Sequence, residues 1–125
     1  MIHSPALHQN NIDGVLKKLE KLLRCYDFII EANTVAGAIE LYKMNQQKAY
    51  EQISSESWWV GKDAVAEADL SIAGGFTPNA RQEQQQLQQL FIDLYQHLTT
   101  AGYKSEYARI VTQQYQKWQV SGMLK

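Results

Sequence analysis

Apolar residues follow helical spacing in three long blocks of this chain. In the first block, residues 12–30, they recur three and four positions apart and form one stripe along a predicted helix of about six turns. Similar stripes occur in residues 79–101 and 105–120. The last block has this predicted core face: Tyr107, Ile110, Val111, Tyr115 and Trp118. The pattern predicts three long amphipathic helices.

Shorter or weaker blocks lie in the middle of the chain. Residues 35–53 carry a thinner apolar stripe, and Met44-Asn45-Gln46 is a candidate point of division into two helices. Asn33-Thr34 is the predicted break before this block, because both side chains can cap a new helix. A short helix is predicted over residues 62–70.

Glycine, threonine and proline mark the predicted turns. Gly74-Gly75 permits positive φ angles, which end a helix and let the chain turn. Thr77 followed by Pro78 predicts a helix start, with Thr77 as the N-cap and Pro78 in the first turn. Gly102 is placed to end the block 79–101, and the short connection makes the last two helices antiparallel neighbours.

The predicted fold is all-α. No segment shows the strict alternation of a half-buried strand, and no internal repeat is found. The length of 125 residues is near the commonest domain size. We expect a single domain over residues 1–125, a bundle of about five to seven helices with short connections. We expect residues 1–10 to be mobile.

Charge is distributed unevenly, although the formal net charge is only −1. Residues 26–69 carry eight acidic side chains against three lysines, whereas residues 104–125 carry four basic side chains against one acidic. The small net charge gives no general footprint for nucleic acid. The acidic middle segment either presents a negative face to a basic partner or is an ordinary solvated surface with chance clustering.

No known catalytic or metal-binding motif occurs in the sequence. Cys25 is the only cysteine, and its place inside the first helix predicts a buried or half-buried, unreactive thiol. The three histidines belong to no HExxH or ExxH motif. No apolar run approaches the roughly 20 residues that span a bilayer. We therefore expect no enzyme, metal or cofactor, no membrane or nucleic-acid partner, and a cytoplasmic location.

The candidate binding surface is the segment that begins with Trp58-Trp59. Tryptophan is enriched where proteins bind one another. Adjacent helical residues point about 100° apart, so we expect at least one of the two rings to be partly exposed. Acidic residues and a phenylalanine follow in the same segment. The predicted partner-binding residues are Glu56, Trp58, Trp59, Asp63, Glu67, Asp69 and Phe76.

The tract from Asp69 to Pro78, together with Trp58-Trp59, resembles segments of small helical bacterial proteins of unassigned function. Some of these are immunity proteins encoded beside polymorphic or contact-dependent toxins. The resemblance covers about a quarter of the chain, and its motif is a turn followed by a helix cap. It implies a cytoplasmic protein that binds one cognate toxin domain and blocks its active site. Such toxins are often basic nucleases, which would suit the acidic middle segment.

The sequence leaves three hypotheses of function open. The first is a non-enzymatic protein-binding module, most specifically an immunity protein that neutralises a toxin domain. The second is a structural or adaptor domain that self-associates through the stripe of the first helix. The third is an enzyme or a metal-binding helical bundle. The identity of any partner and the oligomeric state stay open.

Overall fold

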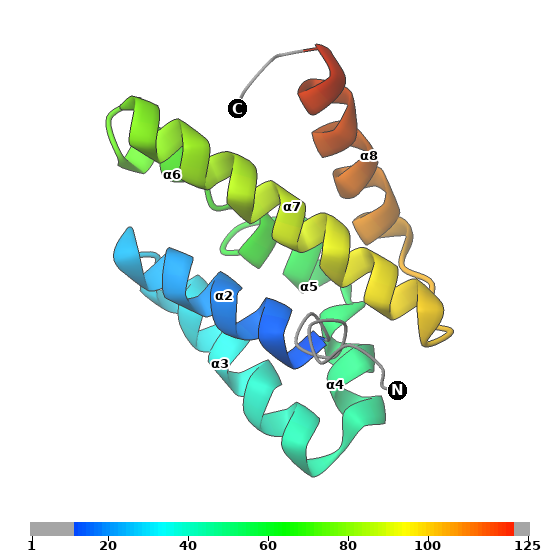
Figure 1. Cartoon of the computed structure of the whole chain (residues 1–125). Coiled ribbons are helices and arrows are strands. Elements are labelled where there is room, and N and C mark those ends of the chain that lie inside the picture. The colour runs from blue at the N-terminus through cyan, green and yellow to red at the C-terminus, as the bar shows by residue number, and fades with distance from the viewer. Residues whose placement is uncertain (1–11, 122–125) are drawn as a thin grey trace, which may run out of the picture.

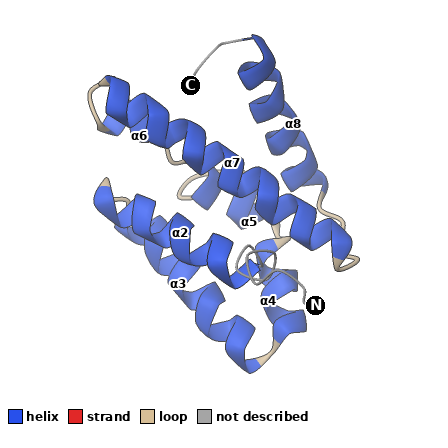
Figure 2. Cartoon of the chain, viewed as in Figure 1, coloured by secondary structure: helices blue, strands red, loops and turns tan. Residues whose placement is uncertain are grey.

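The computed structural model describes residues 12–121, so the segment 1–10 predicted to be mobile lies outside the described residues. Within the described range the chain forms seven α-helices and one 3-10 helix, and no strand (Figure 2). The predicted all-α bundle is thereby confirmed. The elements are α2 (Ile12–Cys25), α3 (Ile29–Met44), α4 (Gln46–Ile53), α5 (Glu56–Trp59), η1 (Val65–Glu67), α6 (Leu70–Ala73), α7 (Pro78–Thr100) and α8 (Glu106–Ser121).

Two long helices, α2 and α7, organise the bundle. α2 forms an antiparallel hairpin with α3, and α7 runs alongside α2 in the opposite direction (Figure 1). The short helix α6 packs against the start of α7. α8 runs back from the end of α7 as its antiparallel neighbour, as predicted, and diverges from it towards its own C-terminal end (Figure 1).

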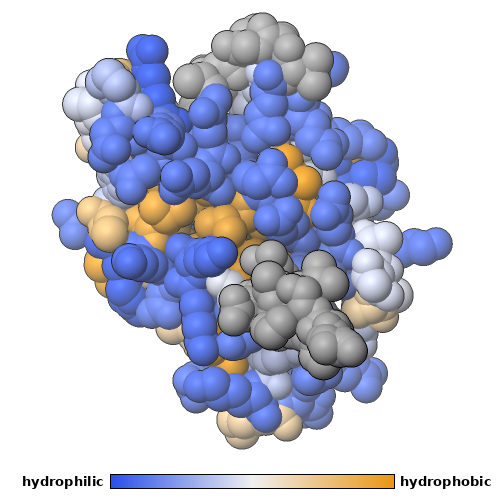
Figure 3. All heavy atoms as spheres, in the orientation of Figure 1, coloured by the Kyte–Doolittle hydropathy of each residue, from blue (hydrophilic) through white to orange (hydrophobic). Residues whose placement is uncertain are grey.

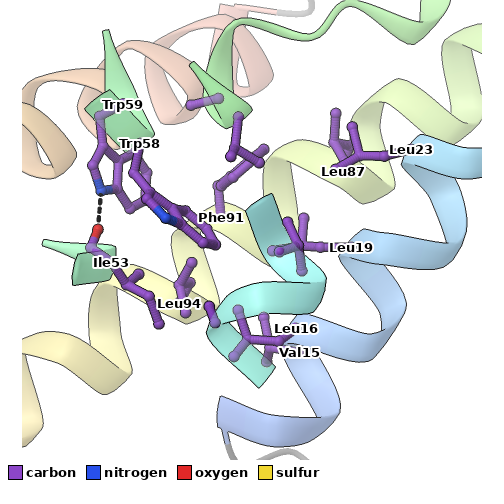
Figure 4. Close-up of a cluster of buried hydrophobic side chains, with 14 of the residues drawn as sticks. Val15, Leu16, Leu19, Leu23, Ile53, Trp58, Trp59, Leu87, Phe91 and Leu94 are labelled. Atoms are coloured by element: carbon purple, nitrogen blue, oxygen red, sulfur yellow. Dashed lines mark hydrogen bonds between the residues drawn. The ribbon is translucent and has the colours of Figure 1, made fainter. Parts of the chain in front are cut away.

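The core lies where α2, α5 and α7 meet (Figure 4). Its largest side chains are Trp58, Trp59 and Phe91. Most of the apolar stripe of α2 is buried here: Ile12, Val15, Leu16, Leu19 and Leu23, whereas Leu22 is only partly buried. Each of the buried side chains stabilises the fold by about 1.5–3 kcal/mol when it leaves water. The part of the predicted stripe that lies in α2 therefore packs mainly into the protein's own core.

The first helix ends at Cys25, earlier than the periodicity predicts. The backbone N–H groups of Asp27 and Phe28 donate back to carbonyl oxygens of its last turn, at 3.2 and 2.9 Å. With Asp27 at φ 63°, these two bonds close a Schellman motif. Ile29 and Ile30 therefore begin α3 instead of extending the stripe of α2. Their side chains are exposed rather than buried.

The predicted break at Asn33-Thr34 is wrong, because both residues lie inside α3. The Thr34 hydroxyl donates to the backbone oxygen of Ile30 at 3.1 Å, one turn earlier in the same helix. Asn33 Oδ1 accepts a hydrogen bond from the Arg24 guanidinium at 3.0 Å. Side chains that can cap a helix are here satisfied without capping one.

The other predicted turns are confirmed. α3 and α4 are separated at Asn45, whose side chain accepts a backbone N–H of α4 at 3.1 Å. Thr77 Oγ1 caps α7 by accepting from the N–H of Ala80 at 3.2 Å, and Pro78 is the first residue of that helix. Gly75 has φ 68° at the end of α6. The chain therefore turns where the sequence places its capping residues.

The helix predicted over residues 62–70 is wrong. Gly61 and Asp63 have positive φ angles of 104° and 63°, which bend the chain before any helix can start. A single 3-10 turn, Val65–Glu67, follows. Asp69 is extended and begins a new helix instead of ending the predicted one. Because of these bends the segment is not a continuous helix, and residues 66–69 form one side of a cleft.

Candidate functional site

Trp58 and Trp59 are both buried, with 1% and 0% of their surface exposed, so the expectation of an accessible ring is wrong. Trp59 Nε1 donates to the backbone oxygen of Ile53 at 2.7 Å, and its ring meets Phe91 edge to face, with 5.5 Å between centroids (Figure 4). Helix α5 has only four residues and is in contact with both η1 and α8, so neighbours cover it on more than one side. The pair belongs to the core.

The other predicted site residues do not share one surface. Glu56 and Asp63 are exposed, one at the start of α5 and the other in the loop before η1. Phe76 is also exposed, in the turn before α7, with φ 60°. Of the four predicted acidic residues, Glu67 and Asp69 line a common cleft. We call it the acidic cleft.

The acidic cleft lies between the segment 66–69 and helix α8, and encloses about 330 Å³. Two carboxylates and small apolar side chains form one side, and α8 provides aliphatic, amide and indole groups on the other. The lining residues are Ala66, Glu67, Ala68, Asp69, Ile110, Val111, Gln114 and Trp118, with the buried side chains of Trp59, Gln84 and Tyr115. The cleft thus combines negative charge with aromatic surface.

The acidic side of the cleft follows from alternating burial along the chain. Ala68 and Leu70 are buried, whereas Glu67 is exposed and Asp69 is half-buried. Asp69 Oδ1 accepts two backbone N–H groups of α6, at 3.0 and 3.2 Å, and the Ser71 hydroxyl at 2.6 Å. This N-cap fixes the direction of the Asp69 carboxylate. Glu67 makes no hydrogen bond or ion pair with another described residue, so its charge is available to a ligand.

Buried polar groups hold this segment against α7 and α8. The Tyr115 hydroxyl donates to the backbone oxygen of Ala66 at 2.8 Å. Burial raises the pKa of Tyr115, and the charges of Glu67 and Asp69 raise it further, so the phenol stays neutral. Gln84 Oε1 accepts the N–H of Leu70 at 2.7 Å. These hydrogen bonds hold the acidic side of the cleft in a fixed position relative to α7 and α8.

The α8 side of the cleft was not predicted as a site. Ile110 and Trp118 were assigned to the core face of the last helix, but Ile110 is 57% exposed and Trp118 only half-buried. The buried face of α8 consists of Ala108, Thr112 and Tyr115. Tyr107 was likewise assigned to the core and is exposed. α8 mainly contacts α7 and α5, so only a narrow strip of it is covered. The four-residue spacing of Ile110, Gln114 and Trp118 was the available signal for a separate face.

A second concavity, the apolar groove, lies between α2 and α7 and encloses about 500 Å³. Leu22, Cys25 and Leu90 line it, with Lys18 and Lys21 along the α2 edge and Glu83, Gln86 and Gln89 along the α7 edge. Figure 3 shows apolar surface between the two helices, bordered by hydrophilic side chains. The exposed thiol overturns the prediction of a buried one, because α2 ends at Cys25 beside an open groove. No aromatic ring is among the described residues of this groove.

The described part of the chain offers no metal site of ordinary composition. Within residues 12–121, no group of three or more His, Cys, Asp or Glu side chains is placed to hold a metal ion. In the same range, none of the helices has both the length and the apolar character needed to cross a bilayer.

Comparisons of the chain with models of protein families, with curated proteins and with solved structures found no match. The resemblance to immunity proteins thus stays a prediction that rests on the sequence tract alone.

Proposed function

We propose that this protein is a non-enzymatic binding module that engages a protein partner through the acidic cleft. The observation that carries the proposal is the placement of Glu67 and Asp69 in the same 330 Å³ cleft as Trp118. Carboxylates attract a basic partner over distance, and an aromatic side chain supplies anchoring area once contact is made. A basic side chain of the partner would enter between them.

Exposed apolar side chains beside the cleft support a protein partner rather than a small ion. Ile110 lines the cleft and is 57% exposed, and Tyr107, one turn earlier on α8, is 41% exposed. Ile72, which does not line the cleft but lies on the helix that Asp69 caps, is 60% exposed. Protein interfaces typically place such apolar and aromatic groups around a few charged contacts.

The most specific form of the proposal is a bacterial immunity protein that acts in the cytoplasm. Three observations support it: the acidic balance of residues 26–69, the tract from Asp69 to Pro78 that resembles such proteins, and the cleft itself. The partner would be a cognate toxin domain with a basic surface, such as a nuclease. Binding at the cleft would block the toxin by covering its basic active site.

Co-expression tests the proposal directly. A toxin encoded immediately beside this gene should be neutralised by the wild-type chain, and Glu67→Lys should protect less, because charge reversal in the cleft weakens binding by roughly ten-fold or more. Glu67 is exposed and unpaired among the described residues, so the variant should fold. Glu56→Lys, an exposed acid outside the cleft, is the matched control. Equal protection by both variants would reject the cleft as the binding site.

The alternative, self-association through the first helix, stays a prediction, and the structure favours it less than the binding module. The apolar stripe of α2 faces the core, with Leu16, Leu19 and Leu23 fully buried. A dimer built on that stripe would require α2 to leave the bundle. We therefore retain the binding module as the proposed function.

A further inference from the structure

The shape and chemistry of the acidic cleft also indicate which basic group enters it. We infer that the cleft accepts an arginine side chain of the partner in preference to a lysine side chain. This inference rests on the proposed function and adds the identity of the recognised group.

Aromatic rings and carboxylates line the cleft together. The Tyr115 and Trp118 rings lie 6.1 Å apart between centroids and are tilted by 43°. Trp118 is only half-buried, so a ligand in the cleft can reach it. A guanidinium group is flat and can stack on an indole face while its N–H groups point sideways to carboxylates. An ammonium group is a compact point charge and has no flat face to stack.

The free acceptors of the cleft are spread over more than one residue. Asp69 Oδ1 is already occupied by three hydrogen bonds of the α6 cap, and the Ala66 carbonyl accepts from Tyr115. Among the carboxylate oxygens of the cleft, Asp69 Oδ2 and both oxygens of Glu67 have no hydrogen bond to another described residue, and the side-chain amide of Gln114 offers a further acceptor. The planar guanidinium of arginine carries five N–H donors and can donate to Glu67 and Asp69 at once. The ammonium of lysine carries three donors on a single nitrogen and matches two separate carboxylates less well.

Much of the rest of the lining is apolar, which also favours arginine. Ala66, Ala68, Ile110 and Val111 offer no polar side-chain atoms to replace water around a cation. Guanidinium is more weakly hydrated than ammonium, so it loses less hydration free energy when it enters the cleft. The same groups can pack along the aliphatic part of the arginine side chain.

An NMR titration of the full chain tests the preference with two small probes, N-acetyl-arginine amide and N-acetyl-lysine amide. The protein has three tryptophans, and the indole N–H signal of Trp118 is identified by its loss in Trp118→Phe. We expect the arginine probe to shift this signal progressively while the signal of Trp58, which is buried and does not line the cleft, stays in place. The lysine probe should bind roughly two- to five-fold more weakly, because its ammonium group cannot stack flat on the indole and cannot reach two carboxylates with a planar fork of donors.

Isosteric variants provide the controls. Glu67→Gln and Asp69→Asn remove one charge each, and asparagine keeps the N-cap of α6. Both should weaken the arginine response, whereas Glu56→Gln should leave it unchanged. Equal responses to the two probes, or none at Trp118, would overturn the inference. If that occurred while Glu67→Lys still reduced toxin protection, the proposed function would stand and only the arginine preference would fall.

Discussion

At the scale of single residues, the two adjacent tryptophans are equally buried but differently bonded. Trp59 Nε1 donates to the Ile53 carbonyl, whereas Trp58 Nε1 has no hydrogen-bond partner among the described residues. Phenylalanine at either position leaves a void, but only Trp59→Phe also leaves a buried carbonyl without its donor. We predict that Trp59→Phe loses about 1–2 kcal/mol more unfolding free energy than Trp58→Phe. Urea denaturation of both variants measures this, and equal losses would contradict the assigned hydrogen bond.

The sequence identified these tryptophans as unusual but could not predict their burial. A doublet on an isolated helix must expose one ring, since adjacent side chains point about 100° apart. α5 is not isolated, because η1, α8 and α7 surround it, and all three follow it in the chain. Segments far along the chain determine whether a side chain on a helix as short as α5 is exposed. Local sequence periodicity therefore cannot predict it.

At the scale of elements, the end of α2 shows how one residue sets a helix boundary. Asp27 occupies the left-handed position that a Schellman motif usually gives to glycine. We predict that Asp27→Gly raises the unfolding free energy by about 0.5–1 kcal/mol, because glycine adopts φ 63° without steric cost. Thermal and chemical unfolding measure the gain. Asp27→Ala should show none, and a gain in the alanine variant would point to loss of charge instead of relief of strain.

Periodicity and capping chemistry predicted the long helices well and the short elements poorly. α7 and α8 lie close to their predicted ranges, and Asn45 and Thr77 cap the helices that follow them. Neither helical periodicity nor capping chemistry predicts the structure between Val60 and Leu70, because this segment consists of a loop, a single 3-10 turn and two extended residues, Ala68 and Asp69. The acidic cleft is built from this segment. Glu67 and Asp69 can be predicted from their charge. The spacing of Trp118 from Ile110 and Gln114 places these three residues on one face of α8, but it does not predict that this face is left partly exposed, which depends on how much of α8 its neighbours cover.

At the scale of the whole molecule, the surface divides its recognition groups between two faces. The acidic cleft lies between residues 66–69 and α8. The apolar groove lies between α2 and α7, with two lysines along its α2 edge. A basic toxin domain would complement the first surface, which carries Glu67 and Asp69, better than the second, where Lys18 and Lys21 outnumber Glu83. We therefore propose that the partner covers the acidic cleft and leaves the α2–α3 hairpin free.

Amide hydrogen exchange, measured on the chain alone and in complex with a toxin domain that it neutralises in co-expression, tests this proposal most directly. If the partner covers the acidic cleft, amide exchange in the complex becomes slower in residues 65–72 and 110–118 and changes little in α2 and α3. Protection confined to α2 and α3, with unchanged exchange along both walls of the cleft, would contradict it.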